Sequence, residues 1–230
     1  AVPMYLSEKK NFSFNADEVL SLINDKTRLI IINNPQNPTG GLIEKSEIDK
    51  LVEGLKKFPE VAILSDEIYS RQIYDGKKMP SFFYYPELYN RLIVMDGWSK
   101  TYAMTGWRLG WSVWPDTLIE KVTRMAINSY SCVSASNQVA ALAALDGPHD
   151  FLDDMMDKFN KRRSLIVDGL NSLPGIKCNN PGGAFYTFPN VSETGMSGDT
   201  FAEKCLYNAG VALVPGISFG KSCTNFVRFS

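Results

Sequence analysis

The residues best suited to chemistry lie in the stretch 96–110, which begins where the apolar run 91–95 ends and includes Ser99, Lys100 and Arg108. A short run rich in branched side chains predicts a buried strand. Lys100 follows the serine, and a lysine in a partly dry site loses its proton more readily and becomes an amine nucleophile. Arginine offers a fixed fork of donors that suits a phosphate. The segment therefore predicts a ligand site at a strand end, where open α/β sheets bind ligands.

An amine of this kind can form a Schiff base with an aldehyde cofactor. Hydroxyl groups and small residues let the backbone approach an anion closely, so the segment suits an aldehyde that also carries a phosphate. Pyridoxal phosphate has both groups. The alternative is a surface lysine in a loop beside an arginine at a strand start, which is the commoner structure for an isolated Ser-Lys pair.

Residues 99–110, with the sequence SKTYAMTGWRLG, resemble the cofactor-lysine motif of the class I/II aminotransferases. These are pyridoxal-phosphate enzymes of the aspartate aminotransferase superfamily, which have fold type I. The resemblance implies that Lys100 forms the Schiff base with the cofactor and that Arg108 and Ser99 bind its phosphate. Many members carry another phosphate-binding serine two positions before Ser99, where this chain has Gly97.

Two further motifs resemble the same family, NPQNPTG at 34–40 and DEIY at 66–69. From the residues alone, the first is a tight strand-to-helix turn and the second is an N-cap aspartate with a packed tyrosine three positions later. The resemblance implies instead that Asn37 and Tyr69 hydrogen-bond the phenolic oxygen of the cofactor. It also implies that Asp66 binds the protonated ring nitrogen.

Three apolar runs, 27–32, 61–64 and 91–95, each end in one of these polar motifs, and an amphipathic helix at 44–58 separates the first two. This βαβ order predicts an α/β fold with a mostly parallel sheet and helices on both faces, like the large domain of aspartate aminotransferase. The carboxyl ends of parallel strands share one edge. We therefore expect four side chains to converge there: Asn37, Asp66, Tyr69 and Lys100.

After Arg108 the sequence first predicts another strand and three helices, and then changes to short strands and turns. We expect a strand at 109–114 and helices at 116–128, 134–145 and 148–173, of which the alanine-rich second should be buried. Short strands, turns and a helix at 200–208 follow, with a strand at 211–214. We predict a pyridoxal-phosphate-binding large domain at 1–160 and a small α+β C-terminal domain at 161–230. Both are expected to be incomplete, because the chain opens and closes abruptly.

Arg228 lies in the last predicted strand, 225–230. An arginine on an edge strand commonly forms an ion pair. The family resemblance implies that Arg228 binds the α-carboxylate of the substrate through two parallel bonds, with Asn37 also at the substrate, and lysine could not copy that fork. The loop 182–186 also matches a family pattern, and we expect its role to be shape rather than chemistry.

Composition excludes several other functions. The 230 residues are 44% hydrophobic with a net charge of −1, which argues against nucleic acid or an acidic membrane as a partner. No apolar run approaches the roughly 20 residues of a membrane span. The four cysteines have no paired spacing, which indicates free thiols and a cytoplasmic location, and a single histidine, His149, argues against a metal site. The resemblance implies a homodimer.

The predicted function is that of a pyridoxal-phosphate-dependent transaminase. Lys100 would hold the aldehyde as a Schiff base and carry the α-proton of an L-amino acid, whose amino group passes to a 2-oxo acid. Asp66 would keep the ring nitrogen charged. A β-lyase or synthase of the same fold would use the same residues. A non-catalytic pyridoxal-phosphate-binding regulatory domain would need a basic helical segment for DNA, and a bare α/β binding module would make every match accidental.

Overall fold

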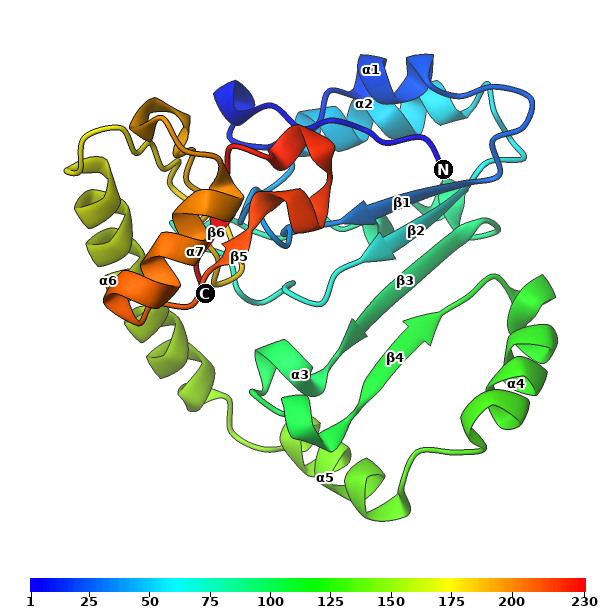
Figure 1. The fold of residues 1–230 in the computed structure, drawn as a ribbon. Coiled ribbons are helices and arrows are strands. Elements are labelled where there is room, and N and C mark those ends of the chain that lie inside the picture. Colours follow the sequence, from blue (N-terminus) through cyan, green and yellow to red (C-terminus); the bar gives the residue numbers. More distant parts are fainter.

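The computed structural model describes residues 1–230 and is built around a four-stranded sheet in the order β1-β2-β3-β4 (Figure 1). Its strands are β1 (Leu29–Asn33), β2 (Ala62–Asp66), β3 (Leu92–Gly97) and β4 (Gly110–Val113). The first three strands are parallel, and β4 runs antiparallel to β3. The mostly parallel sheet predicted from the sequence is confirmed.

The register of the sheet aligns the ends of its strands. Asn33 pairs with Asp66, and Asp66 pairs with Met95, two residues before β3 ends. The loops that follow β1, β2 and β3 therefore leave the sheet at the same edge. They carry the three motifs that the sequence singled out.

One face of the sheet is covered by α1 (Ala16–Ser21) and α2 (Lys45–Leu55) (Figure 1). The side chain of Asn15 caps α1 by accepting a hydrogen bond from the backbone amide of Asp17. The core under these helices joins apolar residues of α2 to inward-facing residues of the strands: Ile48, Leu51, Val52, Leu55, Ile32, Ile63, Leu92 and Val94.

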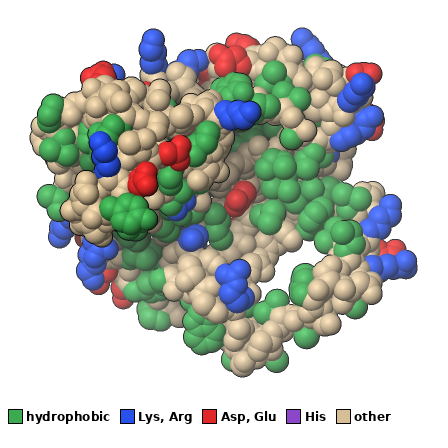
Figure 2. Space-filling model, in the orientation of Figure 1, with side chains coloured by type: hydrophobic (Ala, Val, Ile, Leu, Met, Phe, Trp, Pro, Cys, Tyr) green, Lys and Arg blue, Asp and Glu red, His purple; other side chains and the backbone are tan.

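The opposite face of the sheet is less covered. Side chains alternate between the faces of a strand, so Ile31 and Met95 point away from the core. Ile31 is 65% exposed and Met95 is 42% exposed. Figure 2 shows hydrophobic side chains gathered around a hollow in the centre of the molecule.

Two predicted helices follow β4. They are α4 (Asp116–Tyr130) and α5 (Ala135–Asp146). The prediction that α5 is buried was wrong, because Ala141 is its only buried residue and Val139 is 69% exposed. Alanine favours a helix through its backbone preference alone, so an alanine-rich helix needs no burial to form. It contacts Trp98, the first residue of α3 (Trp98–Thr101), whose Nε1 donates to the carbonyl oxygen of Ala141.

The long predicted helix is α6 (Asp150–Asn171), which runs continuously across the proposed domain boundary at residue 160. It is followed by α7 (Gly198–Ala209) and by the antiparallel pair β5 (Val214–Pro215) and β6 (Val227–Arg228). The strand expected at 211–214 thus begins only at Val214. The boundary itself stays a prediction. None of the helices combines the length and apolar character needed to cross a membrane.

Candidate active site

Lys100 lies in α3 (Trp98–Thr101), the short helix that begins where β3 ends. Its Nζ is 5.8 Å from the centroid of the Tyr69 ring and 5.3 Å from that of Phe185. The Lys100 carbonyl oxygen accepts a hydrogen bond from Nε2 of Gln72 at 3.0 Å. The amine thus lies beside a pair of touching aromatic rings, within the range of a cation–π contact with each.

Gly97, at the junction of β3 and α3, explains a departure from the family motif. A Cβ at this position would lie 2.8 Å from the carbonyl oxygen of Leu109 and 2.9 Å from Cα of Gly110. A serine here would therefore require β4 to shift. Ser99, which remains as a possible phosphate ligand, is partly buried beside Lys100, and its hydroxyl makes no hydrogen bond within the chain.

Asp66 ends β2, and the backbone amide of Ile68 donates to its Oδ1 at 3.2 Å. Burial raises the pKa of the Asp66 carboxyl, and the Ile68 hydrogen bond only partly opposes that effect. No lysine or arginine forms an ion pair with Asp66. The carboxyl therefore lacks the cationic partner that would favour its charged form.

Tyr69 is buried, and its hydroxyl lies 2.8 Å from the hydroxyl of Tyr186. Burial, followed by the hydrogen bond to Tyr186, raises the Tyr69 pKa, and the nearby Asp66 charge adds to this effect. The residue therefore keeps its proton and can act as a donor. Asp66 and Tyr69 lie on a strand end and the turn after it, rather than on one helical turn.

Arg228 in β6 reaches Asn37, which is 191 positions away in the sequence. Its Nη1 donates to Oδ1 of Asn37 at 2.8 Å, while the Asn37 backbone amide donates to Oδ1 of Asn33 at 2.8 Å. The expected alternative of an ion pair is not found for Arg228. Its Nε is buried and has no hydrogen-bond partner, so the guanidinium has an unused donor.

The loop 181–187 interlocks with the loops that follow β1 and β2. The amides of Gly182 and Gly183 donate to the carbonyl oxygen of Gly40, and the amide of Ala184 donates to that of Gln72. A Cβ at Gly183 would lie 2.5 Å from Cγ of Pro35, so only glycine allows this approach. In these contacts the loop holds the neighbouring loops in place through its backbone, which is the structural role expected for it.

Phe185 and Tyr186, which this loop carries, were not predicted to touch the site. Both nevertheless contact the predicted residues, since the Phe185 ring lies near Lys100 and the Tyr186 hydroxyl forms a hydrogen bond with that of Tyr69. The Arg228 guanidinium carbon is also 4.7 Å from the Tyr186 ring centroid and 5.2 Å from that of Phe219. The sequence feature that could have predicted this is the pair of aromatic residues directly after Gly-Gly-Ala at 182–184.

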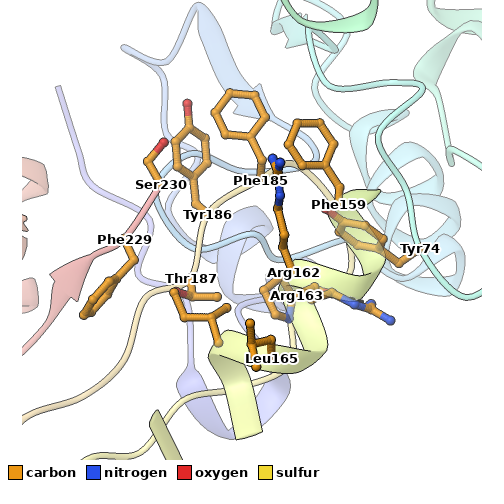
Figure 3. Close-up of a pocket in the computed structure, with 12 residues that line it drawn as sticks. Tyr74, Phe159, Arg162, Arg163, Leu165, Phe185, Tyr186, Thr187, Phe229 and Ser230 are labelled. Carbon is orange, nitrogen blue, oxygen red and sulfur yellow. Dashed lines mark hydrogen bonds between the residues drawn. The ribbon is translucent and has the colours of Figure 1, made fainter. Parts of the chain in front are cut away.

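Arg163 of α6 anchors the loop 181–187 through Pro181. It forms a two-bond ion pair with Asp75, donates to the carbonyl oxygen of Pro181 at 2.9 Å and lies 4.2 Å from the Tyr74 ring centroid. The Arg163 hydrogen bonds hold the pKa of Asp75 below its ordinary value. A cavity of about 490 Å³ is lined by residues of α6 and of the loop, and Figure 3 shows the aromatic rings and arginines among them.

Arg108 follows the turn 105–107, which contacts α3, the helix that carries Ser99 and Lys100. Its Nη1 donates to the carbonyl oxygen of Thr105 at 3.0 Å, and no hydrogen bond or ion pair joins it to another predicted site residue. Its backbone adopts the left-handed region, with φ of 56°, which is unfavourable for a residue with a side chain. The structure therefore brings Asn37, Tyr69, Lys100 and Arg228 into one set of contacts, with Asp66 beside Tyr69.

A family model described as aminotransferase class I and II matches residues 1–230. The chain is 39% identical over 228 residues to an aspartate aminotransferase of Pyrococcus horikoshii, covering 98% of this chain and 57% of that relative. It is 36% identical over 231 residues to aromatic-amino-acid aminotransferase 2 of Thermococcus litoralis, covering 100% of this chain and 58% of the relative.

Solved structures give the same result. The crystal structure of an aromatic aminotransferase from Pyrococcus horikoshii superposes with a TM-score of 0.95 and 35% identity, covering 100% of this chain and 61% of that one. The aspartate aminotransferase of Rhizobium meliloti superposes with a TM-score of 0.92 and 35% identity, covering 100% and 60%. The chain thus spans less than two thirds of the length of these proteins.

Proposed function

Because the chain belongs to the class I and II aminotransferases, a pyridoxal-phosphate-dependent family, we propose that the protein moves an amino group from an L-amino acid to a 2-oxo acid. The observation that supports this most strongly is the contact set of Asn37, Tyr69, Lys100 and Arg228. These residues come from four distant parts of the sequence. Chance matches to three motifs and one arginine would not bring these four side chains together.

The chain's own groups fit pyridoxal phosphate. Asp66 is a half-buried carboxyl without a cationic partner, which suits a protonated ring nitrogen. Tyr69 keeps its proton, so it can donate to a phenolic oxygen, and the Nδ2 of Asn37 is free because Arg228 uses its Oδ1. Ser99 and Arg108 would hold the phosphate, and Arg108 has donors to spare. When bound, the cofactor supplies an aldehyde and an electron-withdrawing ring.

Each residue then has one task in the proposed reaction. Lys100 would hold the cofactor through Nζ and, once the amino acid frees that amine, would carry the α-proton as general base and general acid. Asp66 keeps the proton on the ring nitrogen by opposite-charge pairing. Arg228 binds the α-carboxylate with its planar fork and thereby orients the α-hydrogen. Tyr69 and Asn37 donate hydrogen bonds that steady the ring.

The amino acid substrate belongs to the same proposal. The relatives are named as aspartate and aromatic-amino-acid aminotransferases, so we propose one of these two classes as the amino donor. We further propose that the protein is a cytoplasmic homodimer. The exposed apolar residues Met125, Ile127 and Tyr130 of α4 support a second copy as the partner.

The proposal is tested by absorbance and by a half-reaction. Pyridoxal phosphate added to the protein should give a visible band that borohydride fixes to Lys100, and Lys100→Ala should abolish the band. Aspartate or an aromatic amino acid should then be converted to its keto acid, while the cofactor becomes pyridoxamine phosphate. A β-lyase would release an eliminated group and leave the cofactor as the aldehyde, and that result would overturn the transaminase assignment.

A further inference from the structure

Tyr186 makes two different contacts with the proposed site. Its hydroxyl lies 2.8 Å from the hydroxyl of Tyr69, and its ring lies under the guanidinium of Arg228, 4.7 Å from centroid to Cζ. The residue is itself buried, and it comes from the loop 181–187 rather than from any strand of the sheet. One side chain thus joins the proposed ring contact to the proposed carboxylate contact.

We propose that Tyr186 is a positioning residue, which holds the fork of Arg228 through its ring and directs the proton of Tyr69 through its hydroxyl. The inference rests on the proposed function, because it takes Arg228 to be the group that receives the substrate carboxylate. It extends that function by assigning a role to a residue outside the cofactor motifs.

The ring contact restrains the arginine. The Arg228 guanidinium carbon lies 4.7 Å from the ring centroid of Tyr186 and 5.2 Å from that of Phe219. A guanidinium in contact with two rings has less freedom to rotate than one in water. Since Asn37 binds Nη1 and the buried Nε has no partner, the fork is oriented before a carboxylate arrives.

The hydroxyl contact controls the direction of a proton. Each phenol has one proton to donate, and the two oxygens share one hydrogen bond. If Tyr69 donates to the phenolic oxygen of the cofactor, then Tyr186 must be the donor between the two tyrosines. The cation above the Tyr186 ring draws electron density from its hydroxyl and makes it the better donor. A donated bond to Tyr69 in turn strengthens the bond that Tyr69 donates.

Simple packing is the competing explanation, since Tyr186 belongs to a small buried cluster with Tyr69 and Ala184. Packing alone predicts that phenylalanine would replace Tyr186 without effect. It also predicts that leucine would lower stability and leave ligand affinity unchanged in the folded fraction. The proposal predicts two separate effects. Loss of the ring should weaken the binding of a carboxylate to Arg228, and loss of the hydroxyl should shift the pH midpoint of the cofactor band.

The test uses Tyr186→Phe, Tyr186→Leu and Phe219→Leu in the cofactor-loaded protein, with thermal melting to establish the folded fraction. Succinate is the probe for Arg228, because it has carboxylates but no amino group to react. Tyr186→Phe keeps the ring and should bind succinate within about twofold of the unchanged protein. Tyr186→Leu should weaken binding at least tenfold, and Phe219→Leu should weaken it less.

The hydroxyl is tested by the visible spectrum of bound pyridoxal phosphate. Tyr186→Phe should move the pH midpoint of its band upward by half a unit or more, because a weaker bond from Tyr69 leaves the phenolic oxygen more basic. The charged groups that face Tyr69 are Asp66, Lys100 and Arg228, and the substitution leaves all three in place. An unmoved midpoint together with normal succinate binding by Tyr186→Leu would overturn the inference.

Failure of the inference is distinct from failure of the proposed function. If the unchanged protein transaminates while Tyr186→Leu binds succinate normally, the positioning role is wrong and the function stands. If the unchanged protein does not transaminate but Tyr186→Leu still weakens succinate binding tenfold, the function is wrong and the role of the ring in holding Arg228 is supported.

Discussion

Asp66 carries a partly buried carboxyl group that has no cationic partner in the absence of a ligand. Burial raises its folded-state pKa, so the folded protein binds this proton more tightly than the unfolded chain does. The free energy of unfolding therefore falls as the pH rises from the ordinary carboxyl pKa through the folded one. The Asp66→Asn variant has no carboxyl group at this position, so its free energy of unfolding should not show this decrease. We expect the cofactor-free variant to be more stable than the unchanged protein by about 1 kcal/mol at pH 7 and equally stable near pH 3.

Urea unfolding at the two pH values measures this effect, and Asp96→Asn provides a matched control. The Asp96 pKa is also raised by burial, but Ser70 and the Gly97 amide satisfy its oxygens and no role in binding is proposed for it. In the cofactor-loaded protein, Asp66→Asn should lower transamination by about 100-fold or more. An equal loss of activity in Asp96→Asn would show that Asp66 has no special part in the reaction.

At the scale of elements, the junction between β3 and α3 depends on the missing side chain of Gly97. Gly97→Ser would place a Cβ within 3 Å of the backbone at Leu109 and Gly110, and we expect it to lower the free energy of unfolding by about 1–3 kcal/mol. Gly106→Ser is the matched control, because a Cβ there meets nothing within 4 Å. Urea denaturation compares the two, and equal stabilities would mean that β4 adjusts freely.

The ion pair between α6 and the segment after Tyr74 gives a prediction with a pH dependence. Because Arg163 lowers the folded-state pKa of Asp75, the pair contributes stability above the ordinary aspartate pKa of 3.8, which is lost as the pH falls through the folded value. Asp75→Asn should cost about 1 kcal/mol at pH 7, since the carboxylate is half exposed, and nothing near pH 2.

Thermal melting across that pH range tests the pair. Glu53→Gln is a suitable control, because its ion pair with Lys56 is exposed on α2 and should add no measurable stability. If Asp75→Asn and Glu53→Gln behave alike at pH 7, the pair does not anchor the 181–187 loop. A loss at pH 7 that persists at pH 2 would point to packing rather than charge.

The elements also show what the sequence could predict. The runs 27–32, 61–64 and 91–95 became β1, β2 and β3 because continuous apolar residues bounded by Pro, Gly and polar groups leave few alternatives. The antiparallel direction of β4 was not predicted, since a strand's own pattern is the same in either direction. The exposure of α5 was missed because alanine favours a helix whether or not it is buried.

For the candidate site, the motifs predicted residues but not their contacts. Lys100, Asp66 and Tyr69 lie within short signatures that can be read locally. The contact of Tyr69 with Tyr186 joins residues 117 positions apart, and that of Asn37 with Arg228 joins residues 191 apart, so both depend on how the loops interlock. Whether Arg108 and Ser99 hold a phosphate stays a prediction.

For the whole molecule, the proposed second copy has a surface that it would cover. Ile127 and Tyr130 lie one turn apart on α4 and are 57% and 63% exposed, which leaves apolar surface that a second copy could cover. We expect sedimentation velocity to show a dimer at micromolar concentration, and Ile127→Asp to raise the dissociation constant by about 10-fold or more, because it would bury an unpaired charge at the contact. Tyr207→Asp is the control, since Tyr207 is also exposed, on α7, at the other side of the molecule from α4 (Figure 1). A monomer at every concentration, or equal effects of the two substitutions, would place the dimer contact elsewhere or remove it.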